Sequence, residues 1–97
     1  MLEAQVLITH ETGLHARPSV KLTKLAKGFV ARIELAVVEQ GPWVDAKSIV
    51  KVMATRAPQG STLFIRAEGD DAEAAVAALV DLVRRDFDEG AHVPAND

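Results

Sequence analysis

The residues best suited to chemistry in this sequence stand together in the stretch TGLHARP, at positions 12–18. His15 carries an imidazole, and Arg17 supplies a permanent guanidinium two residues later. A neutral imidazole has a nitrogen lone pair that can act as a nucleophile. A guanidinium has a planar fork of donors that matches the oxygens of a phosphate group. The pair therefore favours chemistry on an anionic group.

The neighbours of His15 predict where its ring lies. Gly13 allows a tight turn, and Pro18 suits the first turn of a helix, where a missing N–H is no loss. We expect that helix to begin at about residue 16, with His15 as its N-cap residue. Unpaired amide groups at a helix start favour an anion, and this positive environment disfavours the imidazolium. The pattern predicts a largely neutral ring that can take up and pass on a phosphoryl group.

The sequence contains no other part of a phosphoryl-transfer enzyme. It has no nucleotide-binding loop and no acidic cluster for Mg²⁺, so we expect no cofactor, and a donor enzyme must be a separate protein. A metal site is not expected, because His10 and His15 have no evident third ligand. His10 and His92 are predicted to be solvent-exposed.

Hydrophobic periodicity predicts the elements that position this site. A period of two is typical of strands, and spacings of three and four are typical of helices. Gly28 is expected to end the first helix. Asp70 or Asp71 is expected to cap the last helix, with Glu73 in a capping box. The last helix is expected to include Phe87. Strands are predicted at 3–9, 32–38, near Val44 and at 61–68, and helices at 16–29, 47–57 and about 70–87. This βαββαβα order predicts an α+β fold with helices on one face of a sheet and its other face open to water.

Length and composition predict one small domain without a membrane anchor. The chain has 97 residues, of which 48% are hydrophobic, which is enough for one core. We place the domain at 1–88 and a flexible tail at 89–97. No apolar run could span a membrane, no secretory leader is evident, and there are no cysteines. A cytoplasmic location is therefore expected.

Charge is distributed unevenly along the chain, whose formal net charge is −3. Basic residues predominate in 16–56, whereas acidic residues predominate in 70–89. A basic face on an acidic protein suits acidic partners or phosphate groups. Nucleic-acid binding is not expected, because such proteins are usually basic overall with exposed aromatics, and only 4% of the residues here are aromatic.

Three motifs in order resemble those of HPr, the family of histidine-containing phosphocarrier proteins of the bacterial sugar phosphotransferase system. These are GLHARP, then AKSIVKVM, and then a glycine followed by a strand ending in AEG. The resemblance runs from about residue 3 to 87 and implies an open-faced β-sandwich, an antiparallel sheet with three helices on one face. We also expect a monomer.

The resemblance implies roles for the residues around His15. Its Nδ1 atom would be phosphorylated by enzyme I, a phosphoenolpyruvate-dependent enzyme, and would pass the group to a permease EIIA-type domain. Arg17 would steady the phosphate. The remaining supporting positions would be Thr12, Gly13, Ala16 and Pro18.

The resemblance also implies a regulatory site and a docking surface. Ser48 matches the serine that an HPr serine kinase/phosphorylase modifies in many members, and it is also a suitable helix N-cap. A phosphate there would add about −2 charge and repel acidic enzyme I. The predicted docking surface, an apolar centre ringed by cations, comprises Val20, Lys21, Lys24, Lys27, Ile49, Lys51 and Met53.

Two alternatives remain open from the sequence. The same phosphohistidine chemistry could serve a regulatory branch that signals carbon or nitrogen status without transporting sugar. A small binding module without phosphoryl chemistry belongs to a different class, in which His15 is only a helix cap.

Overall fold

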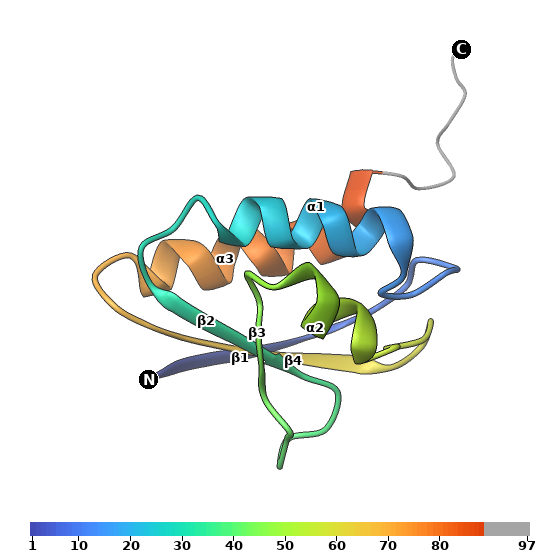
Figure 1. The fold of residues 1–97 in the computed structure, drawn as a ribbon, viewed down its shortest axis with the longest axis horizontal. Helices are drawn as coiled ribbons and strands as arrows, with labels where there is room; N and C mark the ends of the chain where they lie inside the picture. The colour runs from blue at the N-terminus through green and yellow to red at the C-terminus, as the bar shows by residue number, and fades with distance from the viewer. Residues whose placement is uncertain (89–97) are drawn as a thin grey trace.

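Strands and helices follow one another in the predicted βαββαβα order (Figure 1). The computed structural model describes residues 1–88, and the predicted tail at 89–97 lies outside the described residues. A short 3-10 turn, η1, follows the last helix. The elements are β1 (Leu2–Leu7), α1 (Ala16–Ala26), β2 (Arg32–Ala36), β3 (Val44–Asp45), α2 (Ile49–Ala54), β4 (Thr62–Glu68), α3 (Ala72–Arg84) and η1 (Asp86–Asp88).

The four strands form one antiparallel sheet in the order β1-β4-β2-β3. β4, the last strand in the sequence, lies between β1 and β2 and pairs with both of them. The three helices lie on one face of this sheet, with α1 and α3 side by side and α2 next to α1 (Figure 1). The observed architecture is the predicted open-faced β-sandwich. No helix within residues 1–88 is both long and apolar enough to cross a lipid bilayer.

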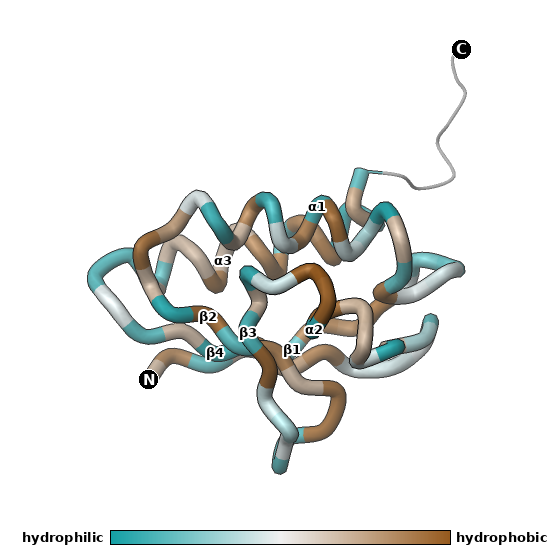
Figure 2. Tube along the Cα trace, in the orientation of Figure 1, coloured by the Kyte–Doolittle hydropathy of each residue, from teal (hydrophilic) through white to brown (hydrophobic). Residues whose placement is uncertain are grey.

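The core lies between the sheet and the helices. Ile33 and Leu35 of β2 are fully buried, and they alternate with the more exposed Arg32 and Glu34. Hydrophobic and hydrophilic colours likewise alternate along α1 in Figure 2, as expected for a helix with one apolar face. Burying a side chain of this size stabilises the fold by about 1.5–3 kcal/mol, which is why the periodicity predicts the elements well.

α1 begins at the predicted residue but ends earlier than its apolar pattern suggests. The helix runs from Ala16 to Ala26, and Lys27 is its C-cap residue. Gly28 follows directly, as expected for a helix end. Phe29, predicted to lie on the helix, packs half-buried against the core from the loop instead.

The prediction that α2 extends to residue 57 was wrong. α2 ends at Ala54 with Thr55 as its C-cap, and Arg56 has a φ of +51°, which lies outside the helical region. Arg56 therefore lies outside α2, although the predicted helix included it. Pro58 lies just beyond this break and disfavours a helical conformation in the residue before it.

The start and the end of α3 also differ from the predictions. Asp71 occupies the N-cap position but makes no side-chain cap hydrogen bond. Its carboxylate instead accepts hydrogen bonds from the amides of Val30 and Ala31, at 2.8 and 2.7 Å. Phe87 lies beyond the helix with a φ of +57°, yet it is fully buried. Contacts with distant residues, and not local helix signals, thus determine the structure at both ends of α3.

Candidate functional site

His15 is the N-cap residue of α1, as predicted, and its side chain is exposed. Its backbone is extended, with φ −132° and ψ 161°, and its carbonyl accepts the amide of Ser19 at 3.4 Å. The ring does not cap the helix, and it has no hydrogen-bond or ion-pair partner within residues 1–88. The imidazole is therefore available to a group that arrives from outside.

The loop before His15 is attached to the segment that follows α2. The amide of Leu14 donates to the carbonyl oxygen of Ala57 at 2.8 Å, and both residues are buried. Gly13 has a φ of +66°, and a Cβ atom there would lie 2.2 Å from that same oxygen. Only glycine fits both the backbone angle and the close approach. The contact holds the predicted nucleophile at a fixed place beside the end of α2.

A pocket of about 340 Å³ opens beside His15, between the start of α1 and the end of α2. It is lined by His15, Met53, Ala54 and Arg56. Met53 was predicted to belong to the docking surface, whereas Arg56 was assigned no role in the site. The signals that could have placed Arg56 here are its charge at the end of a short helix and Pro58 two residues later.

Three further predicted residues form the first turn of α1. Arg17 is exposed and lies near His15 in sequence, but it is not among the residues that line the pocket. Pro18 is buried. Ala16 has a φ of +31°, a conformation that is unfavourable for a residue with a Cβ atom. Strained residues of this kind cluster at functional sites, and this one directly follows the predicted nucleophile.

The prediction that His10 is exposed was wrong, and its position affects Thr12. His10 is buried and packs edge-on against Phe87, with 5.9 Å between the ring centroids. Its Nδ1 atom accepts the amide of Thr12 at 3.2 Å and lies 3.0 Å from the Thr12 hydroxyl. Thr12 therefore bonds to a buried residue that precedes the His15 loop, and its role in supporting the site stays a prediction.

Ser48 is the N-cap residue of α2. Its half-buried hydroxyl accepts the amide of Lys51 at a long 3.4 Å. The structural role predicted for this serine is therefore present, independently of any modification.

The predicted docking positions lie on two adjacent helices, α1 and α2, apart from Lys27, which is the C-cap residue of α1. They are unequally exposed: Val20, Lys24, Lys27 and Lys51 are exposed, and Lys21, Ile49 and Met53 are half-buried.

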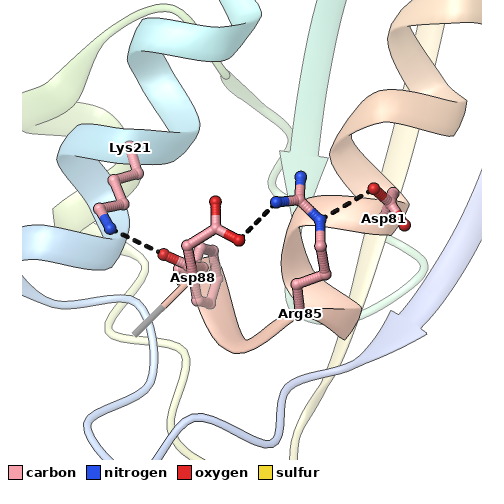
Figure 3. Close-up of polar contacts among 5 residues, drawn as sticks. Lys21, Asp81, Arg85 and Asp88 are labelled. Carbon is pink, nitrogen blue, oxygen red and sulfur yellow. Dashed lines mark hydrogen bonds and ion pairs between the residues drawn. The ribbon is translucent and has the colours of Figure 1, made fainter. Parts of the chain in front are cut away.

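Lys21 makes a contact within the chain. Its Nζ atom donates to the carbonyl oxygen of Phe87 at 3.0 Å. Beside it, Arg85 pairs with Asp81 at 2.9 Å and with Asp88 at 2.5 Å (Figure 3). Lys21 thus helps to hold η1 against α1, in addition to any role in docking.

The described part of the chain, residues 1–88, holds no group of three or more His, Cys, Asp or Glu side chains that could bind a metal ion. What the geometry does provide is an exposed imidazole at a helix start, with a basic pocket beside it.

Comparison with known proteins agrees with this arrangement. Residues 2–85 match the family model described as the PTS HPr component phosphorylation site. The chain is 42% identical over 90 residues to the phosphocarrier protein HPr of Cupriavidus necator, covering 93% of this chain and 99% of that protein. It is 38% identical over 88 residues to the phosphocarrier protein NPr of Shewanella violacea, covering 91% and 94%.

A solved structure shares both the fold and the sequence pattern. The crystal structure of HPr-C-His from Thermoanaerobacter tengcongensis superposes with a TM-score of 0.85 at 39% identity, covering 93% of this chain and 99% of that one. With a family model matched over nearly the whole described domain, and relatives aligned along almost their full length, the chain belongs to the HPr family of phosphocarrier proteins of the phosphotransferase system.

Proposed function

We propose that His15 accepts a phosphoryl group from phosphorylated enzyme I and passes it to a permease EIIA-type domain. The observation that carries the proposal is an exposed imidazole, without a partner in residues 1–88, at the first turn of α1. The family to which the chain belongs is named for its phosphorylation site. A histidine that only capped the helix would be expected to bond to the amides of the first turn, and this ring does not.

The transfer needs little from this chain besides position and charge. The Nδ1 lone pair of His15 forms a bond to phosphorus, while the bond from phosphorus to the donor atom of enzyme I breaks and its electron pair stays with the donor. The helix start and Arg17 favour the negative charge of the transferred group. The second transfer, to the permease domain, repeats this exchange with His15 as the leaving group.

The docking surface supports a transient partner of opposite charge. Val20 and Lys24 of α1, its C-cap residue Lys27, and Lys51 of α2 are all exposed. Such cations increase the rate of encounter with acidic proteins. Ser48 lies at the start of α2 beside Lys51. In this proposal the protein acts as a cytoplasmic monomer, and a serine kinase that modifies Ser48 would weaken enzyme I binding.

Phosphorylation in vitro tests the proposal directly. The protein is incubated with phosphoenolpyruvate and a heterologous enzyme I, and acid-labile, base-stable phosphate is measured. We expect label on the wild type and none on His15→Ala. We expect Arg17→Ala to fold normally and to accept phosphate about tenfold more slowly, because one charge-assisted contact is lost. An unlabelled wild type, or full labelling of His15→Ala, would exclude the phosphocarrier role and leave a binding module.

A second candidate is a regulatory branch with the same chemistry. The similarity to the Shewanella violacea NPr protein, at 38% identity, supports it, although the HPr relative from Cupriavidus necator is more similar at 42%. Phosphorylated protein offered separately to a sugar-permease EIIA domain and to a nitrogen-type EIIA domain would distinguish the branches. Faster transfer to the sugar-type domain is the result we expect.

A further inference from the structure

Arg56 lies beside His15, although the two residues belong to different segments of the chain. We propose that the Arg56 guanidinium contacts the phosphoryl group on His15 and so acts as a second phosphate-binding residue besides Arg17. This inference rests on the proposed function, because it requires that His15 carry a phosphoryl group.

The placement of Arg56 follows from a backbone contact. Leu14 and Ala57 are joined by the 2.8 Å bond described above, and Gly13 lies against Pro58, whose Cα would be 2.9 Å from a Cβ at residue 13. The two segments therefore run in opposite directions past each other. The residue after Leu14 is His15, and the residue before Ala57 is Arg56. Both side chains accordingly line the same pocket.

The Arg56 side chain is uncommitted within residues 1–88. It is exposed and makes no hydrogen bond or ion pair with any residue in that range. Arg32, Arg66 and Arg85 of the same domain are each paired with a carboxylate. A guanidinium that neutralises no carboxylate of its own domain keeps its full charge for an anion in the pocket.

The backbone at Arg56 also indicates a use for its side chain. Its φ of +51° is a conformation that glycine adopts without strain and arginine does not. Two hydrogen bonds hold this conformation. The Arg56 amide donates to the carbonyl oxygen of Met53 at 3.1 Å, and the carbonyl oxygen of the next residue, Ala57, accepts the amide of Leu14. Strained positions that keep a side chain cluster at functional sites.

A cation at this place suits the electrostatics of the pocket. The C-terminal end of α2, including Met53 and Ala54, lines the pocket. The end of a helix carries partial negative charge from its last carbonyl groups, and this charge repels a phosphate. Arg56 lines the same pocket, and its guanidinium offsets this repulsion.

Kinetics of phosphorylation by enzyme I test the inference. Arg56→Gln removes the charge, Arg56→Lys keeps it, and Arg56→Gly removes the side chain while relieving the backbone. Arg84→Gln is the matched control, since Arg84 is an exposed arginine on α3 outside the pocket. We expect phosphoryl transfer to fall about five- to tenfold in Arg56→Gln and Arg56→Gly. We expect less than about a twofold change in Arg84→Gln and partial retention in Arg56→Lys.

Two further measurements separate contact with phosphate from a structural role. Arg56→Gly should unfold at the same or a higher urea concentration than the wild type, although its transfer rate falls. The Nε–H resonance of Arg56 should shift when wild-type protein is phosphorylated. If wild type is phosphorylated on His15 but Arg56→Gln matches Arg84→Gln, or the resonance does not move, this inference is wrong and the proposed function stands. If wild type is not phosphorylated, both are wrong.

Discussion

Replacing Gly13 by alanine should destabilise the domain by an amount that the structure allows to be worked out. A φ of +66° costs a residue with a Cβ atom about 1–2 kcal/mol. The new Cβ would also lie 2.2 Å from the carbonyl oxygen of Ala57, so the two segments must move apart. That movement breaks the buried Leu14–Ala57 hydrogen bond, at a cost of about 1–3 kcal/mol. The sum is about 2–5 kcal/mol, a large part of the stability of a small domain.

A matched control separates the two contributions. Gly60 has a φ of +90°, and nothing lies within 4 Å of a Cβ placed there. Gly60→Ala therefore carries the backbone strain without the steric overlap, and its cost should be about 1–2 kcal/mol. Because φ is more extreme at Gly60 than at Gly13, this control does not understate the strain.

Urea unfolding followed by circular dichroism measures both variants. With a slope of about 1 kcal/mol/M for a domain of this size, the midpoint should fall by about 2–5 M in Gly13→Ala and by about 1–2 M in Gly60→Ala. Phosphorylation of His15 should fall in Gly13→Ala alone, at urea-free conditions where both remain folded. Equal midpoints and equal phosphorylation in the two variants would refute the claim that Gly13 joins the His15 loop to the end of α2.

Three other variants give sharp expectations. Ser19→Ala should leave the free energy of unfolding unchanged or raise it by up to about 1 kcal/mol, because the buried Ser19 hydroxyl has no partner within residues 1–88; a loss above about 1 kcal/mol in urea unfolding would contradict this. The amide of Val30, together with that of Ala31, lowers the pKa of Asp71, so its carboxylate stabilises the fold at neutral pH and loses this effect as pH falls below about 4. Asp71→Asn should therefore be less stable than wild type at pH 7, with a difference that shrinks in urea titrations at pH 3; a constant difference would exclude the charge as its cause. Ser48→Asp should keep α2 capped and weaken enzyme I binding about fivefold at low salt, an effect that high salt removes in calorimetric titrations. Weakening that does not depend on salt would point to a disturbed helix instead.

Local sequence patterns predict the elements of this fold because each one buries a regular face. Ile33 and Leu35 alternate along β2, and Leu22 and Ala26 recur at helical spacing along α1. The start of α1 was also predictable from the sequence, because Gly13 and Pro18 act through their own backbone preferences. The position of His15 at a helix start was therefore predictable from the residues on either side of it.

The ends of elements were less predictable, because there distant residues replace local partners. Asp71 occupies a helix N-cap position, yet its carboxylate bonds to the amides of Val30 and Ala31, which lie between α1 and β2, about forty residues earlier in the chain. His10 is a polar residue near a loop, yet Phe87 covers it from the far end of the chain. Neither pairing has a local signal, since each depends on how α3 and η1 close over the core.

Two of the four residues lining the pocket, Ala54 and Arg56, were not predicted, because contacts between distant segments place them there. His15 is positioned by its own helix, but Arg56 reaches the pocket only because α2 stops early and Ala57 pairs with Leu14. A helix continued through residue 57 would carry Arg56 in a helical conformation and remove the carbonyl of Ala57 from Leu14. The early end of α2 is thus a condition for the basic pocket. It follows that a variant extending α2, such as Pro58→Ala, should affect phosphoryl transfer through Arg56 even though residue 58 does not line the pocket.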